Sequence, residues 1–456
     1  MIGAAPESAA EAETAPDTET GTETAPDTET DTETGTETET ETETETETET
    51  ETETETASEP AGDTETDTAS GPAPADTNTD TVPARGARTP NPRHDDAGQG
   101  TDSCGERTAR TRWLFSAPID LALFGGTAAV ALLLVLAGPS TGSESPEWTW
   151  ITGVLLVDVA HVWSTAFVVY LDPVERHRRP ALYAITPVAA FGAGVSLYVA
   201  GEAVFWRALA YLAVFHFIRQ QYGWVMMYRA RHGERARIGR WLDGATIYAT
   251  TLYPLIVWHT QLPRAFWWMK QDDFVTGLPV ATATIAGWIY AALLAAYAAR
   301  AMLAARRGPV AWGKHVVVAT TAACWYVGIV ATNADYAFTV TNVFIHGVPY
   351  LALVYLYARA AAREPRSRTG ATARLIGRRR GLGVFLATLW AIAYLEELIW
   401  DRAIWHDRGW LFGAGIDVGR AATLIVPLLA VPQLTHYVLD GFLWRRRANP
   451  RLGRLL

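Results

Sequence analysis

Long apolar segments dominate the chain from residue 113 onward. Each is close to the about 20 residues that a helix needs to cross the hydrocarbon core of a bilayer. None of them alternates apolar and polar residues as a barrel strand does, and a backbone in lipid must satisfy its own hydrogen bonds, so we predict helices. The ten segments are Trp113–Gly138, Thr149–Leu171, Ala181–Ala200, Val204–Tyr228, Leu242–Leu262, Leu278–Ala299, His315–Thr332, Ala337–Ala358, Leu382–Trp400 and Arg420–Phe442. The pattern predicts an all-α fold, a polytopic integral membrane bundle of about ten transmembrane helices over residues 113–456.

The connections between these segments alternate in charge. Every second connection, counted with the two flanks of the bundle, is rich in arginine, and together these hold 28 basic residues. The opposite connections hold only Arg264, Lys270, Arg402 and Arg408. Since cytoplasmic loops of membrane proteins carry the excess of Arg and Lys, we expect an integral cell-membrane protein with both termini cytoplasmic. A missed or invented span would disturb this alternation of charge, so the alternation also favours ten spans.

The first 112 residues have the opposite composition. They carry 30 acidic and 6 basic side chains, a balance of −24, whereas the rest of the chain has a balance of +13. From Glu37 to Thr56 the sequence is Glu-Thr repeated ten times. Such a segment repels itself and has no apolar residues for a core, so we expect residues 1–105 to be a disordered, low-complexity, acidic tail. An acidic interaction arm, an array of phosphorylated threonines and a start codon placed too far upstream remain open.

Composition excludes several classes of protein. The apolar spans exclude an ordinary soluble enzyme, and two cysteines, Cys104 and Cys324, are too few for a disulfide-based secreted scaffold. The basic residues lie between apolar spans rather than in one patch, so we expect no nucleic-acid partner. The expected partners are the lipid bilayer and a lipophilic small molecule.

Ionisable side chains within the spans are few, and they come in pairs. Each costs roughly 2.5–3.5 kcal/mol at the bilayer centre on insertion scales, so it should face the protein interior. Four spans carry a histidine with a polar residue three or four positions away, a spacing that places both on one helical face. The pairs are Asp158 and His161, His216 and Gln220, Asn342 and His346, and His436 and Asp440. At 1.5 Å per residue the first three histidines have about the same depth, and His436 is roughly one to two turns closer to the cytoplasm.

This arrangement favours a metal site. Neutral imidazole is the commonest metal ligand in proteins, and its second nitrogen needs an orienting partner. We therefore predict that one intramembrane metal site is formed by His161, His216, His346, His436, Asp158 and Asp440. Gln220 and Asn342 would orient these ligands, and Arg219 would pair with Asp158 or another carboxylate. Iron or zinc suits such ligands, haem less so, and the alternative is that each histidine only makes an interhelical hydrogen bond.

No motif names a reaction. The stretches Phe215–Gly223 and Pro432–Arg445 are dense in polar and aromatic residues, but the His-x-x-x-His and His-x-x-His-His signatures of membrane desaturases and hydroxylases are absent. In plan alone, the chain resembles polytopic membrane oxygenases that hold iron with histidines from several helices. Four hypotheses follow: an oxygenase-like metalloenzyme acting on a lipid or isoprenoid-like substrate, a proton- or ion-coupled transporter, a haem-b carrier, and a membrane scaffold with no catalytic site. Glu396 and Glu397 are expected to form a wetted pair at the end of their span.

The acidic tail should be dispensable for membrane insertion. A chain that begins at Ser103 keeps Arg107, Arg110 and Arg112, which should still orient the first span. We expect this truncation to insert with unchanged topology and to elute in detergent as one symmetric peak, later than the full chain because the expanded tail is gone, measured by protease protection and size-exclusion chromatography. A second truncation, beginning at Trp113, removes the three arginines and should weaken the orientation. Loss of insertion in the Ser103 truncation would refute the prediction.

Overall fold

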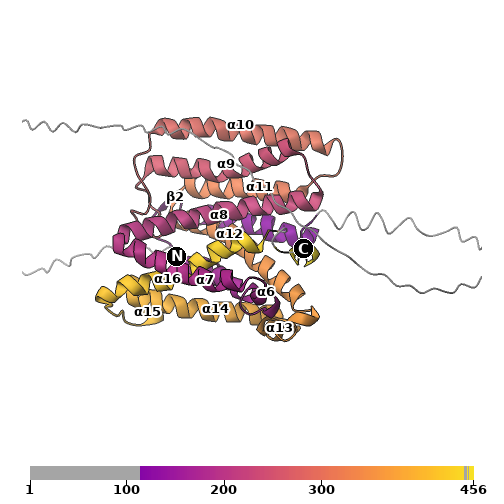
Figure 1. The fold of residues 1–456 in the computed structure, drawn as a ribbon. Helices are drawn as coiled ribbons and strands as arrows, with labels where there is room; N and C mark the ends of the chain where they lie inside the picture. Colours follow the sequence, from indigo (N-terminus) through magenta and orange to yellow (C-terminus); the bar gives the residue numbers. More distant parts are fainter. Residues whose placement is uncertain (1–112, 446–448, 450, 456) are drawn as a thin grey trace, which may run out of the picture. The chain divides into compact units, whose positions relative to one another are not determined.

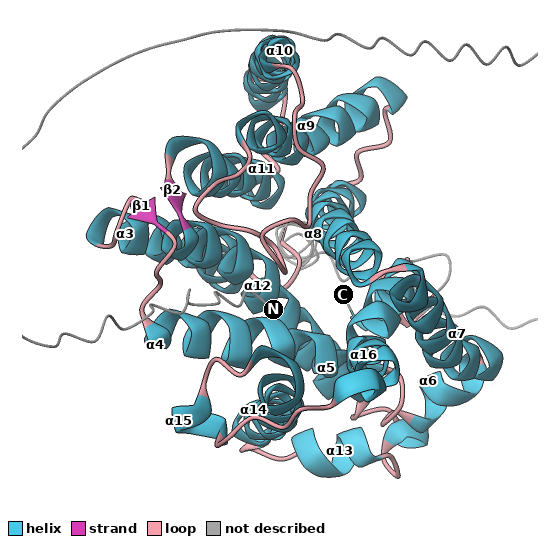
Figure 2. Ribbon diagram, turned by 90° about the vertical axis from the view of Figure 1, so that its left-hand side faces the viewer, coloured by secondary structure: helices cyan, strands magenta, loops and turns pink. Residues whose placement is uncertain are grey.

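The computed structural model describes residues 113–445, 449 and 451–455. The predicted acidic tail, residues 1–105, lies outside the described residues. The described part is mostly helical, and it contains one short parallel pair of strands, β1 (Thr141–Gly142) and β2 (Asn333–Ala334). This pair joins the connection after the first long helix to the residues that precede α12 (Figure 2).

Ten long helical segments match the ten apolar segments of the sequence. Several change between α-helix and π-helix along their length. In chain order they are α2 (Ala117–Asp120) with η1 (Leu121–Gly126) and α3 (Thr127–Ala137); α4 (Glu147–Thr149) with η2 (Trp150–Val159) and α5 (Ala160–Val168); α7 (Pro180–Ala200); α8 (Glu202–His232); α9 (Arg237–Gln261); α10 (Val280–Ala305); α11 (Trp312–Trp325) with η3 (Tyr326–Ala331); α12 (Asp335–Ala361); α14 (Gly381–Trp400) with η5 (Asp401–Trp405); and η6 (Gly419–Ala421) with α16 (Ala422–Leu443). The short helices are α6 (Pro173–Arg178), η4 (Pro365–Ser367), α13 (Ala371–Ile376), α15 (Gly409–Phe412) and α17 (Leu452–Leu455).

Eight of the ten long segments, among the described residues, are long and apolar enough to cross a membrane. The two exceptions are α8 and α9, which have 31 and 25 residues and therefore the length, but not the apolar composition. The structure thus has eight apolar helices of membrane-spanning character. The count of about ten spans, which needs α8 and α9 as well, stays a prediction.

The helices run side by side around α12 (Figure 1). Viewed along their length, α12 lies in the middle, whereas α10, α7 and α14 lie at the edge (Figure 2). Most of the apolar stretch of α12 is buried, 83%, against 6% for α10. The outer helices instead expose large apolar side chains: Leu136 is 82% exposed and Trp288 75% exposed. An apolar exterior of this kind suits lipid rather than water, because exposing so many large apolar side chains to water would cost free energy.

A buried network of charges ties four helices together at one end of the bundle. Asp243 of α9 is fully buried and accepts hydrogen bonds from Arg229 of α8, Arg300 of α10 (2.9 Å) and Lys314 of α11 (3.1 Å). Glu234, between α8 and α9, also accepts from Lys314 at 2.6 Å. Burial alone would raise the pKa of Glu234, but the surrounding cations, Lys314 first, lower it. Some basic residues that the sequence assigns to loops therefore hold helices together.

Cysteine labelling should place the two ends of the bundle on opposite sides of the membrane. Ser143 and Thr369 are both exposed, in connections that the charge alternation assigns to opposite faces. In a background with Cys104→Ser and Cys324→Ala, we expect Ser143→Cys to react with an impermeant maleimide on intact cells. Thr369→Cys should react only after permeabilisation. Reaction of both from outside would contradict the topology.

Candidate metal centre

Four helices bring four histidines into one buried cluster. His161 lies on α5, His216 on α8, His346 on α12 and His436 on α16, and each is at most 5% exposed. Ring centroids in five of the six possible pairs are 4.6 to 6.3 Å apart. Residues 275 positions apart in the chain thus share one centre, which we call the histidine cluster.

The imidazole nitrogens of the cluster face one another. Nε2 of His346 lies 3.0 Å from Nε2 of His161, and Nε2 of His436 lies 3.1 Å from Nε2 of His216. One ligand atom each of His161, His216 and His346 lies within 4.8 Å of the others. In a tetrahedral site with metal–nitrogen bonds of about 2.0–2.1 Å, neighbouring nitrogens are about 3.3 Å apart. The two close pairs would need to open by only a few tenths of an ångström around a metal ion, whereas nitrogens up to 4.8 Å apart would have to approach by up to about 1.5 Å.

A π-helix leads into the cluster on one side. The π-helix η2 ends at Val159, and it carries Asp158 directly before α5. Oδ1 of Asp158 lies 3.4 Å from Nδ1 of His161. Single π-helical turns are rare and frequent at functional sites, because they change the direction of side chains on an otherwise regular helix. Here the carboxylate lies behind the imidazole, the place of a group that orients a metal ligand.

Nδ1 of His436 faces one group from another helix and one from its own helix. Its Nδ1 lies 2.8 Å from Oγ1 of Thr165 on α5 and 3.8 Å from Oδ1 of Asp440, one turn further along α16. Asp440 in turn accepts hydrogen bonds from the hydroxyl of Tyr350 and from Nε1 of Trp444 at 3.2 Å. His216, His436 and Asp440 also form a second group whose ligand atoms lie within 4.8 Å of one another. In the present geometry Asp440 is held more closely by Tyr350 and Trp444 than by His436.

Aromatic rings cover two of the imidazoles. Phe217 stacks on His346 with ring centroids 3.6 Å apart, and Tyr437 stacks on His216 at 4.4 Å. Both covering residues directly follow a cluster histidine in the sequence. The rings fix the imidazole planes and keep water away, so every polar interaction within the cluster acts in a medium of low dielectric constant.

Two of the predicted supporting residues lie against the cluster. Nε2 of Gln220 donates to the backbone oxygen of His346 at 2.7 Å, which links α8 to α12. Nδ2 of Asn342 donates to the backbone oxygen of Phe338 at 2.9 Å, one turn back on α12. Neither bond reaches an imidazole nitrogen, so these residues support the helices that carry His216 and His346.

Arg219 is placed differently from the prediction. Its side chain is exposed, its guanidinium donates to the hydroxyl of Tyr248 on α9 at 2.6 Å, and it lies 4.9 Å from the ring of Tyr222. The prediction paired it with Asp158 or another carboxylate. Arg219 is three residues after His216, about 60° from that residue around the helix, so its long side chain follows the flank of α8 toward α9.

The expectation of a wetted pair at Glu396 and Glu397 was wrong. These residues are only 7% and 3% exposed. Glu396 accepts from the indole nitrogens of Trp163 and Trp400, the second at 3.4 Å. The indole of Trp163, two residues after His161, crosses to α14 and covers the pair.

Sequence reasoning missed further residues around the cluster. Thr165 follows His161 by four positions, Tyr350 follows His346 by four, and Gln433 precedes His436 by three. Each therefore lies on the same helical face as its histidine. These residues could have been identified by following the helical face of each histidine for one more turn. Their partners on other helices could not have been identified in this way.

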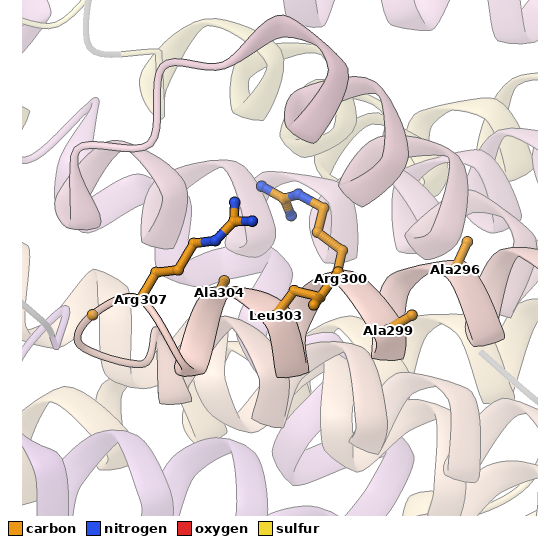
Figure 3. A pocket seen from close by; sticks show the side chains of 7 residues that line it. Ala296, Ala299, Arg300, Leu303, Ala304 and Arg307 are labelled. Atoms are coloured by element: carbon orange, nitrogen blue, oxygen red, sulfur yellow. The ribbon is translucent and has the colours of Figure 1, made fainter.

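A hollow of the surface lies on α10, outside the histidine cluster. Its lining is Ala296, Ala299, Arg300, Leu303, Ala304, Arg307 and Gly308. Figure 3 shows Arg300 and Arg307 rising on one side of the helix over this small-residue stripe. The lining has no histidine, cysteine or carboxylate, so it offers no metal ligand.

Comparisons with known proteins add no family to this picture. No family model, curated protein or solved structure matches this chain. The geometry of the histidine cluster is the observation from which a function can be argued.

Removal of a cluster histidine should remove bound metal. We expect His216→Ala or His436→Ala to lower metal content, measured by inductively coupled plasma mass spectrometry, from about one ion per chain to below about a tenth, because a lost ligand leaves an incomplete site. His259→Ala is the matched control. His259 is also buried, but its ring nitrogens contact Tyr211 and the backbone oxygen of Leu255. Equal metal content in all three variants would show that the cluster holds none.

Proposed function

We propose that this chain is an integral-membrane metalloprotein with both termini in the cytoplasm. One iron or zinc ion is held by His161, His216, His346 and His436. We further propose that it is an oxygenase-like enzyme that acts on a lipid or isoprenoid-like substrate. The observation that supports the metal is the convergence of four buried imidazoles, with Nε2 atoms 3.0 and 3.1 Å apart within two pairs.

Packing alone is a weaker explanation for this cluster. An interhelical hydrogen bond needs one donor and one acceptor, and Ser or Thr can supply these at lower cost than an ionisable ring. Here four rings meet, and the Nδ1 atoms of two of them face Asp158 at 3.4 Å and Thr165 at 2.8 Å. Groups behind the imidazoles fix which nitrogen carries the proton, and so leave Nε2 free to bind a metal.

The donor set suits iron or zinc better than haem. Imidazoles are good ligands for both ions. A haem would need a slot for its macrocycle between facing histidines, and Nε2 atoms about 3 Å apart leave no such slot. A bound ion would supply Lewis acidity and, for iron, oxygen chemistry. The contribution of the chain is to orient the rings through Asp158 and Thr165 and to exclude water with Phe217 and Tyr437.

The surroundings favour an apolar substrate. The small cavity beside the cluster has an aromatic wall that includes Phe217, Trp268 and Phe338. The helices that enclose it belong to a bundle with an apolar exterior, through which a lipophilic molecule can reach the protein from the bilayer. Asp158, Asn342 and Gln433 also line this cavity, so we expect an apolar substrate that carries a small polar end.

A proton- or ion-coupled transporter is the second candidate. The buried carboxylates Glu396, Glu397 and Asp401 on α14 and η5 favour it, because intramembrane acids often mark ion pathways. A membrane scaffold without a catalytic site is the remaining alternative, and it requires only that the imidazoles bond to one another.

Metal analysis joined to a spectrum of the purified protein separates these candidates. We expect about one iron or zinc ion per chain, retained after dialysis against a weak chelator, and no Soret band. A Soret band would indicate a haem carrier instead. A metal-free protein that moves protons in vesicles, read by a pH-sensitive dye, would favour the transporter. A protein with neither bound metal nor proton transport would favour the membrane scaffold.

A further inference from the structure

A small cavity lies beside the aromatic residues that cover the histidine cluster. Its volume is only about 10 Å³, enough for roughly one water-sized group. Phe217 and Tyr437, which stack on His346 and His216, form part of its wall. The cavity is therefore separated from the rings of His346 and His216 by one aromatic side chain each, and Asp158, which faces His161, also lines it.

Two amide oxygens at this cavity are buried and accept no hydrogen bond from the described residues. They are Oδ1 of Asn342 and Oε1 of Gln433, on side chains that are 1% and 5% exposed. The carbonyl of Phe338, which only accepts, fixes the amide nitrogen of Asn342, and Gln433 is placed with its nitrogen toward the hydroxyl of Tyr437. Both oxygens are thus acceptors on an aromatic wall. Because a buried acceptor without a donor is costly, this pair favours a ligand that carries a hydroxyl.

A larger pocket lies on the other side of Met269. Its volume is about 650 Å³, and its lining includes Trp206, Trp267, Trp405 and Lys270. Met269 lines both this outer pocket and the small cavity. It belongs to the non-helical connection between α9 and α10, and its side chain is 2% exposed. A methionine side chain is unbranched and changes rotamer easily, so one residue can separate two spaces and open between them.

We propose that the small cavity is a hydroxyl-binding site and that Met269 is its gate to the outer pocket. Oδ1 of Asn342 and Oε1 of Gln433 accept the hydroxyl, which comes from water or from the alcohol end of an apolar substrate. This inference rests on the proposed function only in placing the hydroxyl beside a metal ion. The cavity, the two acceptors and the gate do not depend on the metal.

Thiol labelling inside the cavity tests the acceptors. Val343 lines the cavity and is 2% exposed, so Val343→Cys in the Cys104→Ser, Cys324→Ala background places a single thiol there. The probes are 2-hydroxyethyl and propyl methanethiosulfonate, which are equal in length and differ in the terminal hydroxyl. The labelling rate of each reagent is divided by its rate with a free thiol in solution, which removes the difference in intrinsic reactivity between the two reagents. We expect Asn342→Leu and Gln433→Leu each to lower the hydroxyethyl-to-propyl ratio about fivefold. An unchanged ratio in both well-folded variants would overturn the hydroxyl site.

The gate is tested with the same thiol. We expect Met269→Ala to raise both labelling rates about tenfold and Met269→Trp to lower them. Met227→Ala on α8 is the matched control, because this residue packs elsewhere in the bundle, and it should leave the rates unchanged. Equal rates in wild type, Met269→Ala and Met269→Trp would overturn the gate.

Competition identifies the source of the hydroxyl. Protection of the thiol by 1-dodecanol, but not by dodecane, would indicate the alcohol end of an apolar molecule. A retained hydroxyethyl preference without such protection would indicate water. Neither readout needs metal, so this inference and the proposed function can fail separately: the expected labelling on a protein that binds no metal would refute only the metal.

Discussion

The cost of burying an imidazole among apolar helices is the constraint on which the structure of this protein depends. Each of the four cluster histidines is at most 5% exposed, and each must find partners inside the bundle. They find one another. Nε2 atoms meet at 3.0 and 3.1 Å, and the far side of two rings is held by Asp158 and by Thr165. A metal ion shared by these nitrogens would hold all four rings to one centre, whereas the hydrogen bonds join them only as two separate pairs.

The rest of the bundle positions and shields the histidine cluster. The helix α12 supplies His346 from the middle of the fold, and the outer helices shield it with apolar surfaces. A network around Asp243 fixes α8, the helix of His216, to α9, α10 and α11 at one end. At the other end, the connection after α9 covers the small cavity with Trp268 and Met269. Ion pairs around Asp243 fix the helices at one end of the bundle. The surroundings of the histidine cluster are apolar apart from a few hydrogen-bonding side chains.

The sequence predicts the helices and the histidine faces well, because both follow from local periodicity. Ten apolar segments became ten long helical segments, and His161, His216, His346 and His436 came together. The sequence does not predict features that depend on tertiary contacts. Arg219 turned to Tyr248 because α9 packs on that flank of α8, and Glu396 became buried because an indole from another helix reaches it. The π-helix before His161 also has no simple sequence signal.

X-ray absorption at the iron or zinc edge of the purified protein tests the central claim most directly, because it reports the ligands of the metal rather than its amount. We expect a first shell of three or four imidazole nitrogens at about 2.0–2.1 Å, with the outer-shell scattering of histidine rings, and one nitrogen fewer in whatever residual metal His436→Ala retains. A shell without imidazole scattering, or a metal whose environment is the same in wild type and His436→Ala, would contradict the claim.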